Sequence, residues 1–222
     1  YFMPTISKED YIKAIYQLES DAEKSVSTTD VANKLEVSKA ATSEMIQRLA
    51  DQGFLNYKKY RGMSLTNEGK KTALHIIRRH RIWELFLMDV LGLTWSEVHA
   101  EAEILEHSTS EFLIEKLDSY LGHPKIDPHG EPIPDKFGNL PVLPNCISLQ
   151  LCEVGKNYRL VKVTDSNREL MNYFTGIGLA LNKLVRVVSR LSYDNSTIIQ
   201  VGSDSFNISE KISSNMFFIE DV

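Results

Sequence analysis

The chain has 222 residues and a formal net charge of −5, with 42% hydrophobic and 25% charged residues. These proportions are typical of a globular protein and exclude a disordered or fibrous chain. The most apolar stretch, residues 82–93, is short and interrupted by Glu84 and Asp89, which excludes a membrane span. A basic segment followed by an apolar one is absent from the start, and only two cysteines occur, so we expect a cytoplasmic protein.

The charge is unevenly distributed along the chain. Residues 1–81 contain 14 Lys and Arg against 10 Asp and Glu, whereas residues 82–222 contain 11 against 20. Residues 58–81 alone hold eight basic residues and one acidic residue. This asymmetry predicts one region that binds a polyanion and another that binds cations.

The N-terminal region predicts three helices and a hairpin. Helical spacing of apolar residues indicates helices over residues 7–20, 27–38 and 39–54, with serine or threonine caps at their starts. We expect Ala41, Met45, Ile46 and Leu49 to form the buried face of the third helix, which Gly53 ends. Alternating residues around Arg61 and Gly62 then predict a basic hairpin. This order is that of a winged helix-turn-helix, and we assign it to a DNA-binding domain at residues 1–73.

The third helix is the expected recognition helix, whose first residues enter the major groove. The residues expected to contact base edges are Ser38, Lys39, Ala40, Thr42, Ser43 and Glu44. The residues expected to contact phosphates are Thr28, Thr29, Arg48, Lys58, Lys59, Tyr60 and Arg61. A tri-helical unit with a hairpin could instead mediate only protein contacts, but the basic hairpin favours double-stranded DNA. One such domain needs a two-fold partner for specificity, so we expect a homodimer on a palindromic operator.

The middle of the chain predicts helices and then a constrained connector. A long helix extends from about residue 66 to Gly92, and two more cover residues 96–108 and 110–122. Six of the seven prolines lie between Pro124 and Pro144, which indicates an ordered connector rather than a flexible tether. We assign residues 74–145 to a helical dimerisation and metal-binding domain. Trp83 and Phe86 of its long helix could belong either to a dimer surface or to the core.

The C-terminal region predicts a small all-β domain. Alternating segments at residues 158–165, 184–192, 196–203 and 216–221 are separated by Gly, Asn, Asp and Ser. The fold class is therefore mainly α with a small β domain: a winged helix-turn-helix, a helical domain, and a β-barrel at residues 146–222.

The segment "HAEAEILEH", residues 99–107, predicts a metal site. On a helix, its potential ligands fall on one face within about 100° of arc, with Glu101 opposite. A solvated charged face is the alternative. A second potential pair, His80 and Glu84, has i, i+4 spacing on the preceding helix, and Asp127 and His129 lie in a proline-bounded loop. The potential ligands on the common face are His99, Glu103, Glu106 and His107.

Carboxylate and imidazole ligands favour Mn(II) and Fe(II), while Co(II), Ni(II), Zn(II) and Cd(II) should also bind in vitro. A di-metal carboxylate enzyme would need Glu three residues before His107, where Ile104 stands, and the motif HExxH is absent. We therefore expect no enzyme. A metal-independent winged-helix regulator remains the alternative, and a metal titration of DNA binding separates the two hypotheses.

Several segments together resemble the diphtheria toxin repressor family of metal-dependent transcriptional regulators, in its long form with a C-terminal SH3-like (FeoA-like) domain. They are "EDYIKAIYQLE", "VSKAATSEMIQRL", "GFLNYKKYRGMSLTNEGK", "RRHRIWELFL", "VHAEAEILEH" and "LGHPKIDPHGEPIP". The resemblance implies repression of metal-uptake genes when the metal is plentiful. Bound metal would fix the DNA-binding unit against the dimer core, and thereby set the spacing of the two recognition helices.

The resemblance also implies two groups of metal ligands. The main regulatory site would comprise Asp10, Glu103, Glu106 and His107, with His80 close by. The ancillary site would comprise Glu84, Asp127, His129 and Asp165, with His99 as an ancillary or neighbouring group. Iron-sensing members have sulfur ligands at the positions of Asp10 and Glu103, so the oxygen ligands here imply a manganese-responsive member.

Overall fold

The computed structural model describes residues 7–21, 25–58, 61–164 and 167–221. Three predicted site residues, Lys59, Tyr60 and Asp165, lie outside the described residues. The chain divides into two compact units. The first comprises Tyr1–His80, Glu106–Thr109 and Pro134–Leu140, and the second comprises Arg81–Leu105, Ser110–Ile133 and Pro141–Val222. The division into three domains at residues 73 and 145 stays a prediction.

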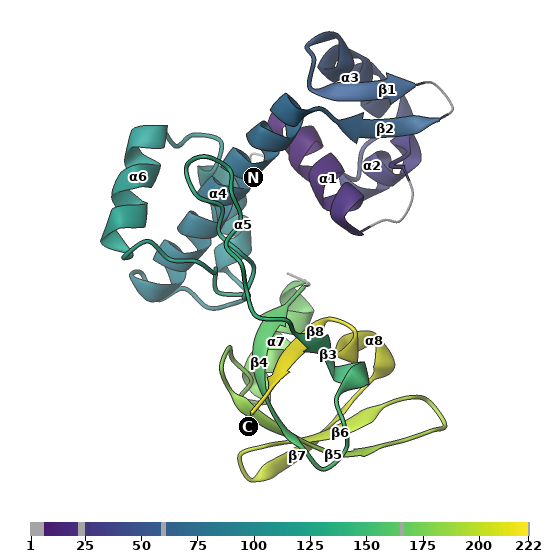
Figure 1. The fold of residues 1–222 in the computed structure, drawn as a ribbon, viewed down its shortest axis with the longest axis vertical. Coiled ribbons are helices and arrows are strands. Elements are labelled where there is room, and N and C mark those ends of the chain that lie inside the picture. The colour runs from purple at the N-terminus through teal and green to yellow at the C-terminus, as the bar shows by residue number, and fades with distance from the viewer. Residues whose placement is uncertain (1–6, 22–24, 59–60, 165–166, 222) are drawn as a thin grey trace. The chain divides into compact units, whose positions relative to one another are not determined.

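The first unit contains the predicted winged helix-turn-helix (Figure 1). Its core holds fully buried side chains such as Ile12, Ile46 and Leu49. The paired strands meet with Leu55 opposite Leu65. Gly62 has φ +90°, and a Cβ there would lie 2.6 Å from Ser25 Oγ, so the hairpin needs glycine at this point. The elements are α1 (Lys8–Asp21), α2 (Thr28–Lys34), α3 (Lys39–Asp51), β1 (Leu55–Lys58) and β2 (Gly62–Leu65).

Serine caps begin α2 and α3, as their sequences predict. Ser27 and Asp30 form a reciprocal capping box, and Ser38 Oγ accepts a hydrogen bond from Ala41 N at 3.2 Å. The predicted buried face of α3 is wrong at one position. Ala41 is exposed and Thr42 is fully buried, where its hydroxyl donates to Ser38 O. The short polar side chain of threonine therefore packs toward the core because its hydroxyl bonds within the helix.

The long predicted helix is α4 (Asn67–Asp89), which passes from the first unit into the second. The second unit continues with α5 (Val98–Leu105) and α6 (Glu111–Tyr120), two of the predicted helices. Trp83 and Phe86 meet edge to face at 5.8 Å between ring centroids and pack against buried Ile82 and Ile114. Among the described residues, no helix is long and apolar enough to cross a membrane.

The C-terminal part of the second unit is a curved six-stranded antiparallel sheet of order β3-β8-β4-β5-β6-β7 (Figure 1). The mainly α fold class with a small β domain is therefore confirmed. Four strands match the predicted segments, but β3, β7, α7 and α8 were not predicted. The elements are β3 (Ile147–Ser148), η1 (Leu149–Leu151), β4 (Asn157–Val163), α7 (Arg168–Gly176), β5 (Leu184–Arg190), β6 (Thr197–Val201), β7 (Asp204–Ile208), α8 (Glu210–Ser213) and β8 (Met216–Glu220).

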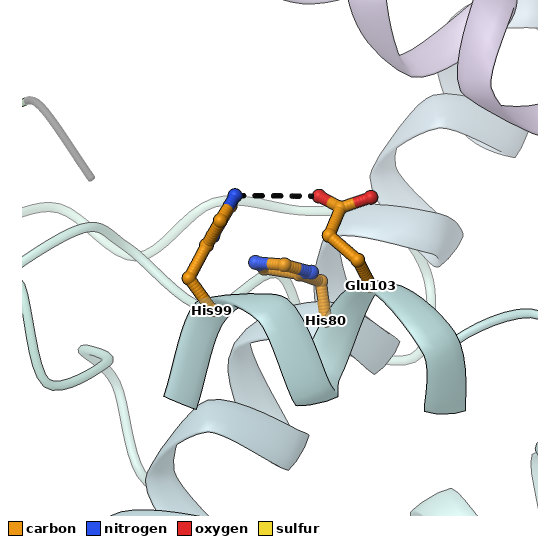
Figure 2. Close-up of side chains that lie close together, drawn as sticks. All are labelled: His80, His99 and Glu103. Carbon is orange, nitrogen blue, oxygen red and sulfur yellow. Dashed lines mark ion pairs between the residues drawn. The ribbon is translucent and has the colours of Figure 1, made fainter. Parts of the chain in front are cut away.

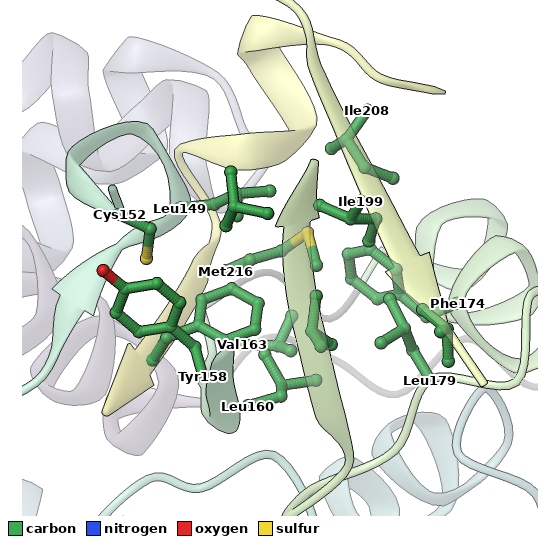
Figure 3. Packing of buried hydrophobic residues seen from close by; sticks show 14 of the residues in the cluster. Leu149, Cys152, Tyr158, Leu160, Val163, Phe174, Leu179, Ile199, Ile208 and Met216 are labelled. Carbon is green, nitrogen blue, oxygen red and sulfur yellow. The ribbon is translucent and has the colours of Figure 1, made fainter. Parts of the chain in front are cut away.

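Large apolar side chains fill the interior of this sheet (Figure 3). Tyr158 and Leu160 from β4 and Phe174 from α7 are buried together there. Truncating a buried phenylalanine to alanine costs about 3–5 kcal/mol in typical cores. This packing fixes β4, and β4 in turn supports a loop of the candidate site described below.

Candidate functional site

The first cluster of ionisable residues lies in the first unit, where α1 begins and where the chain turns after α5. Asp10 and Ser7 cap α1 reciprocally: Asp10 Oδ2 accepts from Ser7 N at 2.6 Å, and Ser7 Oγ accepts from Asp10 N at 3.4 Å. The other oxygen, Oδ1, lies 2.8 Å from His107 Nε2. The helix cap thus orients the Asp10 carboxylate toward the imidazole.

His107 is held between carboxylates on both ring nitrogens. Its Nδ1 lies 2.9 Å from Glu9 Oε2, and that oxygen also accepts from Arg79 at 3.0 Å. Burial alone would lower the pKa of His107, but the hydrogen bond to Glu9 and the charges of Asp10 and Glu106 raise it above its ordinary value. A cation that bound at Nε2 would therefore displace a proton.

Glu106 is the buried centre of this cluster. Its side chain is fully buried, and Lys13 Nζ donates to Oε1 at 3.0 Å and to Oε2 at 2.9 Å. His80 Nδ1 lies 2.6 Å from Oε2. Burial raises the pKa of Glu106, yet the hydrogen bonds and charges of His80 and Lys13 outweigh burial, so the pKa lies below its ordinary value.

Three of the predicted main-site ligands come together in the first unit. Asp10, Glu106 and His107 each offer a ligand atom within 4.8 Å of the others. The expectation that Glu106 and His107 share a helix face with His99 is wrong in detail, because α5 ends at Leu105 and both residues lie in the following turn.

In the second unit, Glu103 lies on α5 one turn after His99. Its Oε1 is 3.6 Å from His99 Nε2, as the dashed line in Figure 2 marks. Glu101 is exposed, which agrees with the prediction that it faces away from the ligand face.

The second cluster lies in the second unit and comprises Arg81, Glu84, His99, Asp127 and His129. Glu84, on α4, is only 2% exposed. Its Oε1 lies 3.1 Å from His99 Nδ1 and 3.7 Å from His129 Nε2. The structure therefore groups His99 with Glu84 and His129, three of the residues expected at the ancillary site.

Asp127 is a buried carboxylate in the predicted proline-bounded loop. Its Oδ1 accepts from His129 N at 2.8 Å and from Glu131 N at 2.9 Å, which closes the turn. Its Oδ2 lies 3.4 Å from Arg81 Nε. Burial, followed by the nearby charge of Glu84, raises the pKa of Asp127 to about 7. The contact with Arg81 lowers the pKa of Asp127, but burial and the charge of Glu84 outweigh it.

The C-terminal sheet supports this loop. Val163 N, at the end of β4, donates to His129 O at 2.8 Å. A Cβ on Gly130 would lie 2.0 Å from Val161 O, so the loop approaches β4 as closely as only glycine permits. The buried Trp95 ring stacks on the His129 ring at 5.6 Å, with 9° between the planes. These contacts fix the His129 imidazole next to Glu84.

Both clusters offer a donor set that fits a divalent cation. Their carboxylate oxygens and imidazole nitrogens suit Mn(II), Fe(II) and Zn(II). In the second cluster, burial and the charge of Glu84 raise the pKa of Asp127, and a bound cation would make ionisation of both carboxylates less costly. The Cys152 thiol is buried in the C-terminal core with its pKa raised to about 12, so it does not serve as a thiolate ligand.

The candidate nucleic-acid face is the start of α3. The side chains of Ser38, Lys39, Ala40, Ser43 and Glu44 are on exposed positions, where base edges could be reached. The expectation for Thr42 is wrong, because this residue is fully buried. Ala41, which the apolar spacing predicts in the core, is exposed instead.

Of the predicted phosphate-binding residues, Lys58 and Arg61 are exposed on the hairpin, and Thr28 and Thr29 are half-buried at the start of α2. Arg48 is exposed but forms a 2.6 Å ion pair with Glu44, one turn earlier on α3. Three residues contact the clusters without having been expected there from the sequence: Glu9, Arg79 and Trp95. Of these, only Glu9 has a local sequence signal, because it lies next to the helix cap.

Three family profiles match the chain in order. Residues 3–63 match "Iron dependent repressor, N-terminal DNA binding domain", residues 66–135 match "Iron dependent repressor, metal binding and dimerisation domain", and residues 147–218 match "FeoA domain". Together with the winged helix-turn-helix and the carboxylate and imidazole clusters, they define the class: a metal-dependent DNA-binding regulator.

Individual relatives place the chain within that class. It is 32% identical to a solved structure described as "Manganese-dependent transcriptional repressor complex with manganese", covering 97% of this chain and 100% of that chain at a TM-score of 0.87. It is 31% identical to ScaR with bound Zn²⁺, covering 97% and 100% at a TM-score of 0.81. The iron-dependent repressor IdeR of Mycobacterium leprae (strain TN) is 37% identical over 126 residues, which are 57% of this chain and 54% of that relative. The match thus spans about half the length of this curated relative. The chain belongs to the diphtheria toxin repressor family of metal-dependent transcriptional repressors.

Proposed function

We propose that this protein is a dimeric, Mn(II)-dependent repressor that acts in the cytoplasm on metal-uptake genes. The observation that carries the proposal is the contact between Asp10 and His107 in the first cluster. Asp10 belongs to α1 of the winged helix-turn-helix, and His107 follows α5 in the region that matches the metal-binding and dimerisation profile. A cation at this contact would tie the two regions together.

The proposed main site comprises Asp10, Glu103, Glu106 and His107. Glu103 is included because the family resemblance implies it as a ligand and because it lies on α5 shortly before the turn that holds Glu106 and His107. The proposed ancillary site comprises Glu84, His99, Asp127 and His129, with Asp165 as a further acid. The close approach of Gly130 to β4 supports an ancillary role, because it links these ligands to the C-terminal sheet.

A bound cation would supply positive charge in place of the proton on His107, and the residues around it would hold its ligands in position. The Ser7 cap keeps the Asp10 carboxylate oriented, and Glu9 with Arg79 holds the imidazole from its other nitrogen. Once α1 is fixed, the recognition helices of a dimer take the spacing of two operator half-sites. A shift from mostly inactive to mostly active needs about 5 kcal/mol of differential binding, which coordination can supply.

The preference for manganese over iron rests on the ligand atoms. Oxygen and imidazole donors at every proposed position favour a hard divalent cation over one that needs thiolate. The names of two relatives cited above give different metals: one is described as manganese-dependent and one as iron-dependent. We propose Mn(II) as the physiological metal, with Fe(II) as the competing candidate.

A homodimer on a palindromic operator is the proposed assembly. Phe112 and Tyr120 on α6 are 73% and 69% exposed, and Leu91 after α4 is 58% exposed. Large apolar side chains of this exposure are typical of surfaces that bury against a partner. Light scattering of wild type and of Phe112→Glu tests this surface, with loss of the dimer in the variant as the expected result.

The central experiment measures DNA binding under each metal. Operators are first selected from random duplex DNA in Mn(II), and affinity is then measured with Mn(II), anaerobic Fe(II), Zn(II) or chelator. We expect Mn(II) to raise affinity at least about 100-fold, and Asp10→Ala and Glu103→Ala to abolish that gain. Glu101→Ala, on the exposed face of the same helix, is the matched control and should behave as wild type. Activation by Fe(II) alone would overturn the manganese assignment.

A metal-independent winged-helix regulator is the second candidate. The ion pairs of Lys13 with Glu106 and of Asp10 with His107 favour it, because they satisfy much of the first cluster without a metal. Equal DNA affinity in Mn(II) and in chelator, unchanged by Asp10→Ala, would support this alternative against the proposed function.

A further inference from the structure

Trp95 belongs to the helical region in sequence but packs in the core of the C-terminal sheet. It lies between α4 and α5, in a turn that is fixed by Glu97, whose Oε2 accepts from Thr94 N at 2.9 Å and from Thr94 Oγ1 at 2.6 Å. The Trp95 side chain is only 7% exposed and is part of the buried apolar cluster inside the sheet. This one residue therefore links the two parts of the second unit.

The Trp95 ring contacts two other rings. It stacks on the His129 imidazole, with 5.6 Å between the centroids and 9° between the planes. It also lies 6.3 Å from the Phe174 ring, at 43°. Phe174 comes from α7, is fully buried and lies within the apolar cluster of the sheet (Figure 3). Trp95 thus contacts both a proposed metal ligand and the core of the C-terminal sheet.

The main chain of His129 is fixed by hydrogen bonds, but its side chain needs a further restraint. His129 N donates to Asp127 Oδ1 at 2.8 Å, and His129 O accepts from Val163 N at 2.8 Å. These bonds do not by themselves select one rotamer of the imidazole. A flat indole that lies nearly parallel to the imidazole restricts its rotation, and so keeps Nε2 near Glu84 Oε1, at 3.7 Å.

A purely structural role does not account for tryptophan at this position. Its Nε1 is buried, and none of the described residues accepts a hydrogen bond from it. A buried donor without an acceptor costs free energy, which phenylalanine or leucine would avoid. The feature that the indole adds is a large flat surface parallel to the imidazole.

We propose that Trp95 is a positioning residue of the second cluster: it holds the His129 imidazole for binding of a divalent cation, and it makes this affinity depend on the packing of the C-terminal sheet. The inference rests on the proposed function, since it assumes that the second cluster binds such a cation. An oriented ligand raises affinity because fewer side-chain conformations are lost on binding. A change in packing at Phe174 reaches His129 through Trp95.

The test measures Mn(II) affinity by electron paramagnetic resonance of the unbound ion. The parent is the full chain with Asp10→Ala and His107→Ala, which remove two proposed ligands of the first cluster. In this parent, Trp95→Met fills the space without a flat ring and should weaken Mn(II) binding about 10-fold. Trp95→Phe restores a flat ring, so its affinity should be within about threefold of the parent.

Two phenylalanines of the same core separate positioning from stability. Phe174 and Phe218 are both fully buried in the apolar cluster of the sheet. Phe174 contacts Trp95, whereas Phe218 lies 6.5 Å from the Tyr158 ring. Phe174→Leu and Phe218→Leu should both lower the temperature of thermal unfolding. Only Phe174→Leu should also weaken Mn(II) binding, by about threefold, since it acts one contact further from the metal than Trp95→Met.

Several results would overturn the inference. They are unchanged Mn(II) affinity in Trp95→Met, affinity in Trp95→Phe as low as in Trp95→Met, and equal losses of affinity in Phe174→Leu and Phe218→Leu.

Should Trp95→Met fail to fold, crystals of the wild-type chain grown in Mn(II) decide. We expect His129 to bind manganese with its ring still parallel to that of Trp95, and a bound imidazole turned away from Trp95 would contradict the inference. A parent chain that binds no Mn(II) would instead overturn the proposed second metal site, so the two failures are distinguishable.

Discussion

The two clusters differ in how their surroundings shift the pKa of a buried carboxylate. In the first, Lys13 and His80 neutralise Glu106, and the pKa of Glu106 falls below its ordinary value. In the second, Asp127 and Glu84 are buried near each other, and the pKa of Asp127 rises to about 7 despite the contact with Arg81. Similar residue types therefore form one cluster in which the central carboxylate ionises more readily than usual and another in which a buried carboxylate ionises less readily.

The difference follows from the supporting elements. The first cluster is assembled from a helix cap, a buried lysine and a turn, all of which supply donors to the carboxylates. The second depends on a loop that packs against β4, where backbone N–H groups donate to one oxygen of Asp127 and Arg81 lies 3.4 Å from the other. The stability of the second cluster should therefore depend more strongly on packing and on pH than that of the first.

The largest expected effect is that of Gly130→Ala on the second cluster. A Cβ at Gly130 would meet Val161 O at 2.0 Å, so we expect a loss of about 3–5 kcal/mol in the free energy of unfolding, or release of the loop from β4. Gly138→Ala is the matched control. It also has positive φ, but its nearest neighbour would be at 3.7 Å, so it should cost only about 1 kcal/mol.

Urea unfolding of both variants measures this difference. Equal losses in the free energy of unfolding of the two variants would show that the close approach of Gly130 to β4 adds no constraint of its own. The contrast between a loop-supported and a helix-supported cluster would then be wrong.

The second prediction concerns Asp127→Asn in the metal-free protein. In the unfolded chain Asp127 ionises near pH 3.8, but in the folded protein it keeps its proton to about pH 7, so its ionisation destabilises the fold as pH rises between these values. Asparagine retains the Oδ1 acceptor of the turn and carries no charge. The variant should be more stable than wild type at pH 8, by on the order of 2 kcal/mol, and not at pH 4.

Asp135→Asn is the control, because Asp135 closes a similar turn with Oδ1 and is exposed. Its pKa is lowered by hydrogen bonds to Asn139, so its charge stabilises the fold above the unfolded pKa, and the substitution should reduce stability slightly at pH 8. Thermal unfolding against pH checks both signs. Destabilisation by Asp127→Asn at pH 8 would contradict the prediction that the ionised Asp127 carboxylate destabilises the metal-free fold at that pH.

The smallest expected effect is that of Glu9→Gln on the first cluster. Burial lowers the pKa of His107, and the hydrogen bond to Glu9 is the largest contribution that raises it. Glutamine should lower this pKa and reduce competition from the proton, so Mn(II) affinity at pH 6.5 should rise about threefold, with no gain at pH 8.5. In the metal-free wild type, the raised pKa stabilises the fold below pH 6.5, and this stability disappears as pH rises through the folded pKa.

Calorimetric titration with Mn(II) at the two pH values measures the change in affinity, with Glu101→Gln as an exposed control. An equal change at both pH values would mean that Glu9 acts through general charge rather than through the imidazole proton.

Local patterns predicted most helices, the N-terminal hairpin and four strands of the C-terminal sheet, because caps and apolar spacing act within a few residues. Helix α7 was missed although Asn167 caps it through Glu169 N and Leu170 N and its buried Met171 and Phe174 have helical spacing. The surrounding alternation of strands obscured this short signal.

The candidate ligands were predictable by type and spacing, but their protonation and neighbours were not. Nothing local indicates that Lys13 is buried against Glu106, 93 residues later, or that Trp95 stacks on His129. The exchange of Ala41 and Thr42 has the same origin, since a one-residue rotation of α3 depends on packing rather than on hydrophobicity alone.

The most direct test of the central claim is the reciprocal linkage between metal and DNA. Mn(II) affinity is measured on wild type with and without saturating operator duplex, at fixed pH and salt. If metal at the first cluster fixes the DNA-binding conformation, operator DNA must tighten Mn(II) binding by the same factor by which Mn(II) tightens DNA binding. We predict equal factors of about 100 or more, lost in Asp10→Ala. Mn(II) affinity that is unchanged by operator DNA would contradict it.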